Sequence, residues 1–448
     1  MSARNRELLA LIPASLLVTA GFAAILIQGA HGQVADNKAI SNGSVTYGLI
    51  FLGLCLATHV VIRLTLPYAD PYLFPLVAVL ACFGLVMLYR IDETLARKQA
   101  TVFVFGLVLF AATLVFLRDY RRLERYRYVI ALAGIGLLLL PRVPGIGAPV
   151  NGAYLAIKFP LVGAFQPAEF AKLAIVIFLA SYLRDTRQVL VQGGRRVLGM
   201  NIPRVKDLGP LLVVWGAAMV LLVFIRDLGS SLMFFGGFLA ILYVATNRFS
   251  FVAIGLGMFG AGAWFFATHV GHVQQRVDTW LHPFDTKLYN ATGGSYQVAQ
   301  SLFAQADGGL FGRGFGQAML TLPNGKFFLP APQTDLIYSV ITNELGLFGA
   351  CAVLLTYLLV VERGFKIAML ARDSFSGLLA AGLTAVFALQ VFVIVGGVTK
   401  AIPLTGVTLP FISFGGSSIL ANFVLLALLL LVSDRARRQG TDGRRPLV

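Results

Sequence analysis

Residues 411–432 read FISFGGSSILANFVLLALLLLV and contain no charged side chain. A helix of this length rises about 33 Å, which matches the roughly 30 Å hydrocarbon core of a bilayer. The whole chain has the same character, since 58% of its 448 residues are hydrophobic and 12% are charged. A soluble domain is about half apolar and about one quarter charged. The composition therefore excludes soluble, disordered and disulfide-stapled classes and predicts a multi-pass membrane protein.

Apolar segments of this kind predict an all-α integral membrane protein with twelve helices. They lie near residues 8–28, 45–62, 72–89, 100–117, 128–141, 168–183, 208–225, 228–246, 250–268, 336–361, 375–397 and 411–432. The segments 128–141 and 168–183 are shorter than the roughly 20 residues that a crossing needs. The first segment is longer than the apolar region of a signal peptide, and no clear cleavage site follows it, so we interpret it as a retained helix.

The distribution of basic residues predicts the orientation of the chain. An even number of crossings places both termini on one side of the membrane. If that side is the cytoplasm, the inner connections and termini hold 23 Lys and Arg, and the outer ones hold 12, of which four lie in the long loop 269–335. Basic residues favour the cytoplasmic side. The net charge of +16 is thus mostly a property of topology, and it gives no reason to expect a nucleic-acid partner.

Residues 166–172, QPAEFAK, form a first candidate site at the mouth of a helix. Pro167 suits the first helical position, and Glu169 then falls in the first turn, where the helix dipole favours an anion. Lys172 is three residues further on and shares a face with Glu169. A charged pair in a membrane helix is a candidate functional site. A structural ion pair that fixes two helices is an equally open interpretation.

Two aspartates precede apolar segments. Asp227 stands before segment 228–246 and is favoured as its N-cap. Asp335 follows Pro330 and Pro332 and is the last charged residue before segment 336–361. It could cap that helix, or it could act as a base at the water–lipid boundary, where a lipid-carried substrate would present its reacting group. Both interpretations of Asp335 remain open.

Breakers and small residues interrupt the apolar pattern in two places. Residues 403–418 include Pro403 and Pro410, which imply irregular backbone that must be buried in protein or line a wet cavity. Ser417 and Ser418 could bind an anion at a helix start, although close helix packing is favoured over that interpretation. Gly312–Gly316 lacks the strand and the Lys-Ser/Thr of a nucleotide loop and predicts a flexible or tight turn.

These motifs resemble the SEDS family (shape, elongation, division and sporulation), which includes RodA and FtsW. Eight family motifs occur here in the family's order, at Asn151–Ala153, Gln166–Lys172, Asp227–Gly229, Gly308–Gly314, Thr334–Asp335, Glu344–Gly346, Pro403–Gly406 and Pro410–Ser418. The resemblance implies a ten-helix SEDS glycosyltransferase core at 72–434, with outer loops 142–167 and 269–335. Residues 1–71 would then form two additional helices, and residues 435–448 a basic cytoplasmic tail.

The resemblance also implies a function. Family members are similar to polymerases that join lipid II disaccharides into glycan strands at the outer face of the bacterial cytoplasmic membrane. The transfer inverts the anomeric centre and releases undecaprenyl pyrophosphate from the growing lipid-linked strand. The expected partner is a class B penicillin-binding protein, a transpeptidase. The family's essential aspartate corresponds to Asp335, which we expect to be the general base, and its helix-mouth pair corresponds to Glu169 and Lys172.

The leaving pyrophosphate needs positive charge. The resemblance implies a divalent cation, Mg²⁺ or Mn²⁺, for which Asp335 is a candidate ligand. Basic side chains could contribute as well. The further candidates for contact with substrate or pyrophosphate are Asn151, Arg226, Asp227, Arg313, Lys400, Ser417 and Ser418.

Several positions depart from the family pattern. Ala156 stands where a Trp is usual, Ala331 and Gln333 replace a common Glu and His, and Arg226 replaces a common Pro. Loss of such a contact would alter the rate or the specificity. Two other functions stay open on this basis, a lipid II flippase and a divergent scaffold for a penicillin-binding protein. The short tail and the variant outer motifs favour a RodA-like role.

The charge asymmetry generates a test of topology. In intact cells, a membrane-impermeant thiol reagent should label a cysteine placed near residue 325 and should miss one placed near residue 195. The expected pattern follows because the long loop 269–335 is assigned to the outside and the basic connection 184–207 to the inside. The reverse labelling pattern would overturn the orientation.

Overall fold

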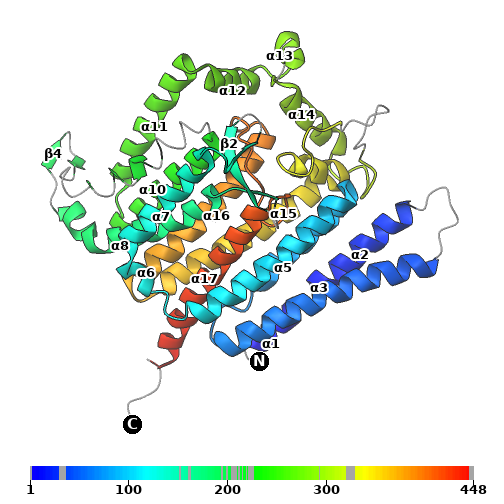
Figure 1. Cartoon of the computed structure of the whole chain (residues 1–448), viewed down its shortest axis with the longest axis horizontal. Coiled ribbons are helices and arrows are strands. Elements are labelled where there is room, and N and C mark those ends of the chain that lie inside the picture. The colour runs from blue at the N-terminus through cyan, green and yellow to red at the C-terminus, as the bar shows by residue number, and fades with distance from the viewer. Residues whose placement is uncertain are drawn as a thin grey trace. The chain divides into compact units, whose positions relative to one another are not determined.

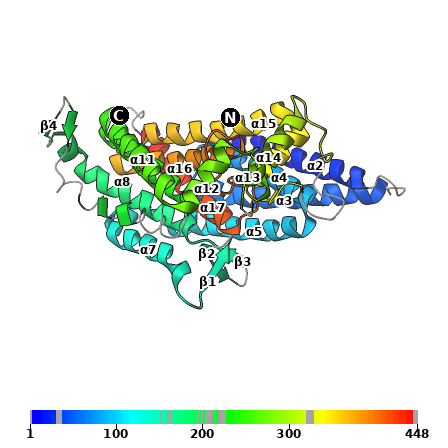
Figure 2. The same cartoon turned by 90° about the horizontal axis from the view of Figure 1, so that it is seen from above.

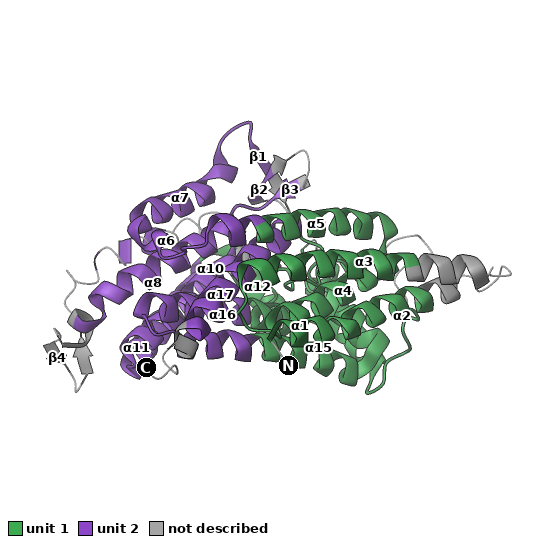
Figure 3. Cartoon of the chain, turned by 90° about the horizontal axis from the view of Figure 1, so that it is seen from below, with its two compact units in different colours: residues 1–111, 270–360, 390–415 green, residues 112–269, 361–389, 416–448 purple. Residues whose placement is uncertain are grey.

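The computed structural model describes residues 3–29, 37–150, 153–159, 163–192, 195–197, 200–202, 209, 212–213, 215–217, 219, 227–291, 293–318 and 328–442. Helices make up most of this part of the chain (Figure 1). The chain divides into two compact units (Figure 3). Unit 1 comprises residues 1–111, 270–360 and 390–415, and unit 2 comprises residues 112–269, 361–389 and 416–448.

Unit 1 contains the first helices of the chain and the helices of the long outer segment. They are α1 (Ala3–Ala10), α2 (Ile12–Gly29), α3 (Asn37–Thr65), α4 (Leu73–Ile91), most of α5 (Glu93–Phe116), α12 (Gly271–Leu281), α13 (Thr286–Asn290), α14 (Tyr296–Gly308), the first part of α15 (Ile337–Leu370) and the last part of α16 (Ser374–Val398). Helix α2 packs against both α3 and α4. The segment predicted as the long outer loop is therefore partly helical.

Unit 2 holds the remaining elements. They are α6 (Arg122–Arg125), α7 (Arg127–Leu139), η1 (Leu140–Arg142), β1 (Gly147–Val150), β2 (Ala153–Phe159), β3 (Gly163–Phe165), α8 (Ala168–Gln192), β4 (Arg195–Val197), β5 (Met200–Ile202), α10 (Leu228–Thr246), α11 (Phe249–His269) and α17 (Gly416–Asp442), with the other parts of α5, α15 and α16. Helix α8 packs against α7, α10 and α17. In the most apolar window of α17, 89% of the residues are buried, against 6% in α11. Helix α17 is thus a core helix, whereas α11 exposes almost all of its most apolar window.

Nine helices of the described residues are long and apolar enough to cross a membrane. They confirm nine of the twelve predicted segments. Segment 128–141 corresponds to α7, which has 13 residues, and segment 168–183 to α8, which has 25 residues including several charged ones. Segment 208–225 lies mostly outside the described residues. The chain is therefore a multi-pass integral membrane protein built mainly from helices.

Two boundaries and one loop differ from the sequence-based expectation. The last helix begins at Gly416, not at 411, because Phe411 has a φ of 65°, which a right-handed helix cannot contain. The first crossing begins near Ala3, since α1 precedes α2. The predicted outer loop 142–167 contains three strands, β1, β2 and β3, which form an antiparallel sheet in that order.

Figure 2 shows this sheet next to the end of α7. Ala148 pairs with Ala156, and the register shifts between Ala148 and Pro149. A proline has no backbone N–H to donate to a ladder, which is consistent with an irregularity at that point. Ala156, where the family usually has a Trp, is fully buried in β2.

Candidate functional site

Asp335 ends a tight turn immediately before α15, in unit 1. The backbone N–H groups of Thr334 and Leu336 donate to the carbonyl of Ala331, at 3.2 and 3.4 Å. Ala331 begins this turn with a φ of 50°, which is uncommon for a residue with a side chain. Among the described residues, no α15 amide donates to the Asp335 carboxylate. The geometry gives no support to the N-cap interpretation.

The segment 410–415 holds this turn in place. The backbone N–H of Phe414 donates to the carbonyl of Gln333 at 2.8 Å. The hydroxyl of Ser413 donates to the carbonyl of Thr334 at 2.8 Å. Two motifs that are almost 80 residues apart in the chain are therefore joined at the residue before Asp335.

Two buried side chains in turn fix the segment 410–415. The amide of Gln99, in α5, donates from Nε2 to the carbonyl of Ser413 at 2.9 Å and accepts at Oε1 from the N–H of Gly415 at 3.3 Å. The hydroxyl of Tyr357, in α15, donates to the carbonyl of Pro410 at 2.5 Å. Irregular backbone in a membrane protein needs such internal partners, since lipid offers none.

Helix α12 holds the other irregular segment of unit 1. Arg276 donates to the carbonyl of Leu404 at 2.9 Å, and the indole N–H of Trp280 donates to the carbonyl of Lys400 at 3.0 Å. Lys400 has a φ of 62° and ends α16 with a reversal of the chain. The loop that follows α16 is thereby fastened to the outer segment by side chains one helical turn apart.

The Asp335 carboxylate lies between these parts. A Cβ built on Gly406 would stand 3.5 Å from Asp335 Oδ2, so the loop 403–406 passes directly beside the carboxylate. Burial raises the pKa of Asp335 to about 6, while a hydrogen bond from Thr334 and the positive charge of Arg276 act to lower it. A carboxyl group with that pKa can exchange a proton near neutral pH.

Polar atoms without partners lie in the same loops. The side-chain oxygens Gln333 Oε1, Thr405 Oγ1 and Thr408 Oγ1 are buried and have no hydrogen-bond partner in the described part of the chain. Buried polar groups are nearly always bonded, so such atoms point to a role beyond packing. Their chemistry suits the hydroxyl and amide groups of a sugar.

The glycine-rich loop is a tight turn, as predicted, with positive φ at Gly312, Gly314 and Gly316. It runs along α15 where Gly346, with a φ of 67°, interrupts the helix. The N–H of Gly314 donates to the carbonyl of Glu344 at 3.0 Å. Nearby, the N–H of Arg313 bonds the carbonyl of Asn343 (2.9 Å), and the N–H of Leu347 bonds the carbonyl of Gly309 (2.9 Å).

A buried ion pair reinforces this attachment. Glu344 Oε2 accepts from the N–H of Gly316 at 2.9 Å, and Glu344 Oε1 lies 3.4 Å from Arg90 Nε. Arg90 also donates to the carbonyls of Gly316 and Ala318. The side chain of Arg313 forms an exposed ion pair with Asp307 at the edge of a cavity of about 590 Å³.

Glu169 and Lys172 belong to unit 2 and form an ion pair there. Lys172 Nζ lies 2.5 Å from Glu169 Oε2, and both residues are buried, at 3% and 7% exposed. Just before them, the N–H of Gln166 donates to the Ser417 hydroxyl at 2.7 Å. Ser418 accepts from the side chain of Asn422. These bonds favour the packing interpretation of the two serines.

The remaining candidates are distributed as follows. Asp227 is the N-cap of α10, as predicted, and accepts from the N–H of Ser230 at 2.9 Å. Asn151 and Arg226 lie outside the described residues. Asp335, Arg313 and Lys400 all belong to unit 1, whereas Glu169, Lys172, Asp227 and both serines belong to unit 2. The described residues contain no group of three or more His, Cys, Asp or Glu placed to hold a metal.

Sequence reasoning missed Arg276, Gln99 and Arg90. Each acts on a backbone segment distant in the chain, and none stands in one of the eight motifs. The amphipathic composition of 271–281 could have indicated a surface helix on the outer segment, but nothing in it singles out Arg276.

The Glu169–Lys172 pair generates a stability prediction. Glu169→Ala or Lys172→Ala should lower the folded yield, because each leaves a buried charge without its partner, at a cost of about 3–5 kcal/mol. The double variant Glu169→Lys/Lys172→Glu should recover part of that loss. Thermal unfolding of the purified variants measures the effect. Harmless single variants with a worse double would show that the pair contributes nothing.

Comparison with known proteins gives consistent matches. A model of the FtsW, RodA and SpoVE family, described as cell cycle protein, matches residues 70–438. Peptidoglycan glycosyltransferase RodA of Mycobacterium tuberculosis is 42% identical over 447 residues, covering 97% of this chain and 91% of that protein. A chain of a solved peptidoglycan synthase complex, studied for its coordination of polymerization and crosslinking, matches with a TM-score of 0.65 and 27% identity, covering 83% of this chain and 99% of that one. The crystal structure of rod shape determining protein RodA from Thermus thermophilus matches with a TM-score of 0.58 and 26% identity, covering 82% and 97%.

Proposed function

The chain belongs to the FtsW, RodA and SpoVE family of cell cycle proteins, and we infer that it is a peptidoglycan glycosyltransferase which polymerises lipid II. Within this function, we assign the chemistry to Asp335. The observation that carries this assignment is a single carboxylate, partly buried between three family motifs, whose pKa is raised to about 6.

The proposed reaction is an inverting glycosyl transfer. The GlcNAc C4 hydroxyl of one lipid II attacks the MurNAc anomeric carbon of the growing lipid-linked strand. A new glycosidic C–O bond forms, the bond from that carbon to the pyrophosphate breaks, and undecaprenyl pyrophosphate leaves. The proton of the attacking hydroxyl passes to a carboxylate oxygen of Asp335, which acts as the general base.

The neighbours of Asp335 suit this role. A base is most effective when its pKa lies near the working pH, since it is then both ionised and basic enough to accept a proton. Burial raises the pKa of Asp335, and the hydrogen bond from Thr334 and the positive charge of Arg276 keep that shift moderate. We assign Arg276 as a positioning residue, because it also holds the loop at Leu404 beside the carboxylate.

Asp335→Asn separates catalysis from structure. Asn keeps the shape of the side chain but cannot accept the proton, so polymerisation of lipid II should fall by roughly 10²-fold or more while the protein remains folded. Glycan length on gels, with purified protein and lipid II, measures the outcome. The matched control is Asp285→Asn on the same outer segment, where Asn can replace the N-cap of α13 and activity should stay at the wild-type level.

A well-folded Asp335→Asn protein that polymerises at the wild-type rate would defeat the assignment. It would favour the flippase or the scaffold interpretation. A lipid II translocation assay in vesicles would then distinguish those two.

The pH dependence of the reaction tests Arg276. The wild-type rate should decline below a pH of about 6, by about tenfold per pH unit, as Asp335 becomes protonated. Arg276→Gln removes the positive charge that lowers the pKa of Asp335, so the acidic limb of kcat/KM should move to higher pH. Arg276→Lys keeps the charge and should leave the limb in place. A limb that is identical in all three proteins would remove Arg276 from the site.

The leaving pyrophosphate calls for positive charge, and we propose a divalent cation. Mg²⁺ in proteins is commonly held by one or two carboxylates together with substrate phosphates. The donor set here, the Asp335 carboxylate beside the Thr334 hydroxyl, is of that sparse kind. When bound, the cation would offset the charge that develops on the pyrophosphate. Arg313 and Lys400, both in unit 1, are further candidates for this role.

The setting of the enzyme is proposed on the same grounds. We place it in the bacterial cytoplasmic membrane with both termini in the cytoplasm, as the charge asymmetry indicates. A ten-helix core with two additional N-terminal helices agrees with a family match that begins at residue 70. The similarity to a chain of a peptidoglycan synthase complex supports a class B penicillin-binding protein as the partner.

A further inference from the structure

Unit 2 contains a basic cavity to which the proposed glycosyl transfer assigns no role. It has a volume of about 620 Å³ and is formed by the connection between α5 and α7 together with α8 and α17. Its walls consist of six arginines, three acids and one tyrosine: Asp119, Arg121, Arg122, Glu124, Arg125, Arg127, Tyr128, Arg184, Asp185 and Arg435. The walls therefore carry an excess of three positive charges.

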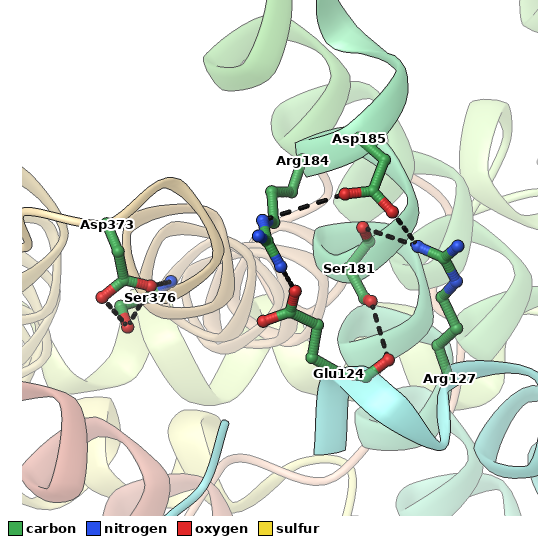
Figure 4. A network of polar contacts seen from close by, with 7 residues as sticks. All are labelled: Glu124, Arg127, Ser181, Arg184, Asp185, Asp373 and Ser376. Atoms are coloured by element: carbon green, nitrogen blue, oxygen red, sulfur yellow. Dashed lines mark hydrogen bonds and ion pairs between the residues drawn. The ribbon is translucent and has the colours of Figure 1, made fainter. Parts of the chain in front are cut away.

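Three of the arginines are neutralised by the three acids. Figure 4 shows the ion pairs of Arg184 with Glu124 and of Arg127 with Asp185. Ser181 connects them, because its carbonyl accepts from Arg127 and its hydroxyl donates to the carbonyl of Glu124. Arg184 Nε also lies 3.8 Å from Asp185 Oδ1. These contacts fix the guanidinium groups that form one wall of the cavity.

The third acid, Asp119, pairs with Arg435 of α17 at 3.4 Å. Every acid in the wall is then engaged. Arg121, Arg122 and Arg125 have no ion-pair partner in the described part of the chain, and the excess charge belongs to them. Guanidinium groups that face a cavity without a carboxylate suit an anion with several oxygens, and phosphate is the match in geometry.

An apolar strip continues from the cavity along α7. Tyr128 lines the cavity and is 53% exposed, and Val129 and Leu132 beyond it are 64% and 71% exposed. Tyr128 and Leu132 are four residues apart and share a face of the helix. A soluble phosphate compound would make no use of this strip, whereas an acyl chain would cover it. An aromatic side chain between the basic and the apolar parts is typical of the membrane interface.

We propose that this cavity binds the phosphate headgroup of an anionic membrane lipid, with an acyl chain along α7. The unpaired Arg121, Arg122 and Arg125 hold the phosphate, and the paired arginines keep the opposite wall in shape. Basic pockets at the cytoplasmic ends of membrane helices bind such headgroups in other proteins. Binding itself depends on neither the catalytic assignment nor the orientation; the orientation decides only which leaflet supplies the lipid.

The test uses the purified full-length protein in a neutral detergent, titrated with phosphatidylglycerol or phosphatidylcholine and followed by native mass spectrometry. Phosphatidylglycerol should bind more tightly than phosphatidylcholine. Arg122→Gln/Arg125→Gln should weaken phosphatidylglycerol binding by roughly 25-fold, or about fivefold for each arginine. Both side chains are exposed and unpaired, so the variant should fold as the wild type does.

The matched control is Lys366→Gln/Arg372→Gln. These two residues are exposed in the same unit and lie outside the cavity, so phosphatidylglycerol affinity should stay within about twofold of the wild type. Equal losses in both double variants would mean a diffuse charge effect and would overturn the site. Unchanged binding in Arg122→Gln/Arg125→Gln would do the same.

Two further arms identify the source of the phosphate. Millimolar inorganic phosphate should not displace phosphatidylglycerol; full displacement would assign the cavity to a soluble phosphate and overturn the lipid. An acidic peptide that binds the wild type and fails on Arg122→Gln/Arg125→Gln, with lipid binding intact, would assign the cavity to a protein partner instead.

Discussion

The fold around Asp335 depends on one constraint, that backbone polar groups surrounded by lipid and apolar side chains must find partners inside the protein. Two segments of unit 1, at 400–406 and 410–415, leave the helical conformation and would violate it on their own. Side chains provide the hydrogen bonds that the absent helix would have made. Gln99 both donates to and accepts from the backbone of segment 410–415. Arg276 and Trp280 donate to backbone carbonyls of segment 400–406. The Asp335 carboxylate lies where these two segments meet the N-terminal end of α15.

The pattern of apolar residues predicts where most of the long helices lie, but it does not predict the residues at which they begin and end. Hydropathy identifies long stretches without charged residues, and most of α17 lies in such a stretch. It includes Phe411, which is apolar but has a φ that no right-handed helix permits. Hydropathy likewise cannot detect the β1–β3 sheet, because strands of only 4, 7 and 3 residues carry little periodicity. The two short predicted segments are both helices. Helix α7 differs from the others in its length of 13 residues, and α8 differs in its charged side chains.

The sequence predicts those residues of the candidate site whose position follows from their near neighbours in the chain. Asp335 stands at a helix boundary in a recognisable motif, and Glu169 and Lys172 are three residues apart, so helical geometry alone pairs them. Arg276 is 128 residues from the carbonyl that it holds, and Gln99 is more than 300 residues from its partners. The periodicity of a sequence gives no information about contacts between residues so far apart in the chain. Such side chains become visible only when the chain is folded.

Gly312 and Gly346 lie against each other where the glycine-rich loop 312–316 crosses the interruption in α15. A Cβ on Gly312 would stand 2.1 Å from the Glu344 carbonyl, and one on Gly346 would stand 2.3 Å from the N–H of Gly312. The loop is otherwise attached through its backbone, by bonds that any residue type can make. Over evolutionary time, the exposed side chains of Leu310 and Phe311 are therefore free to diversify toward new surroundings, while the two glycines must persist together.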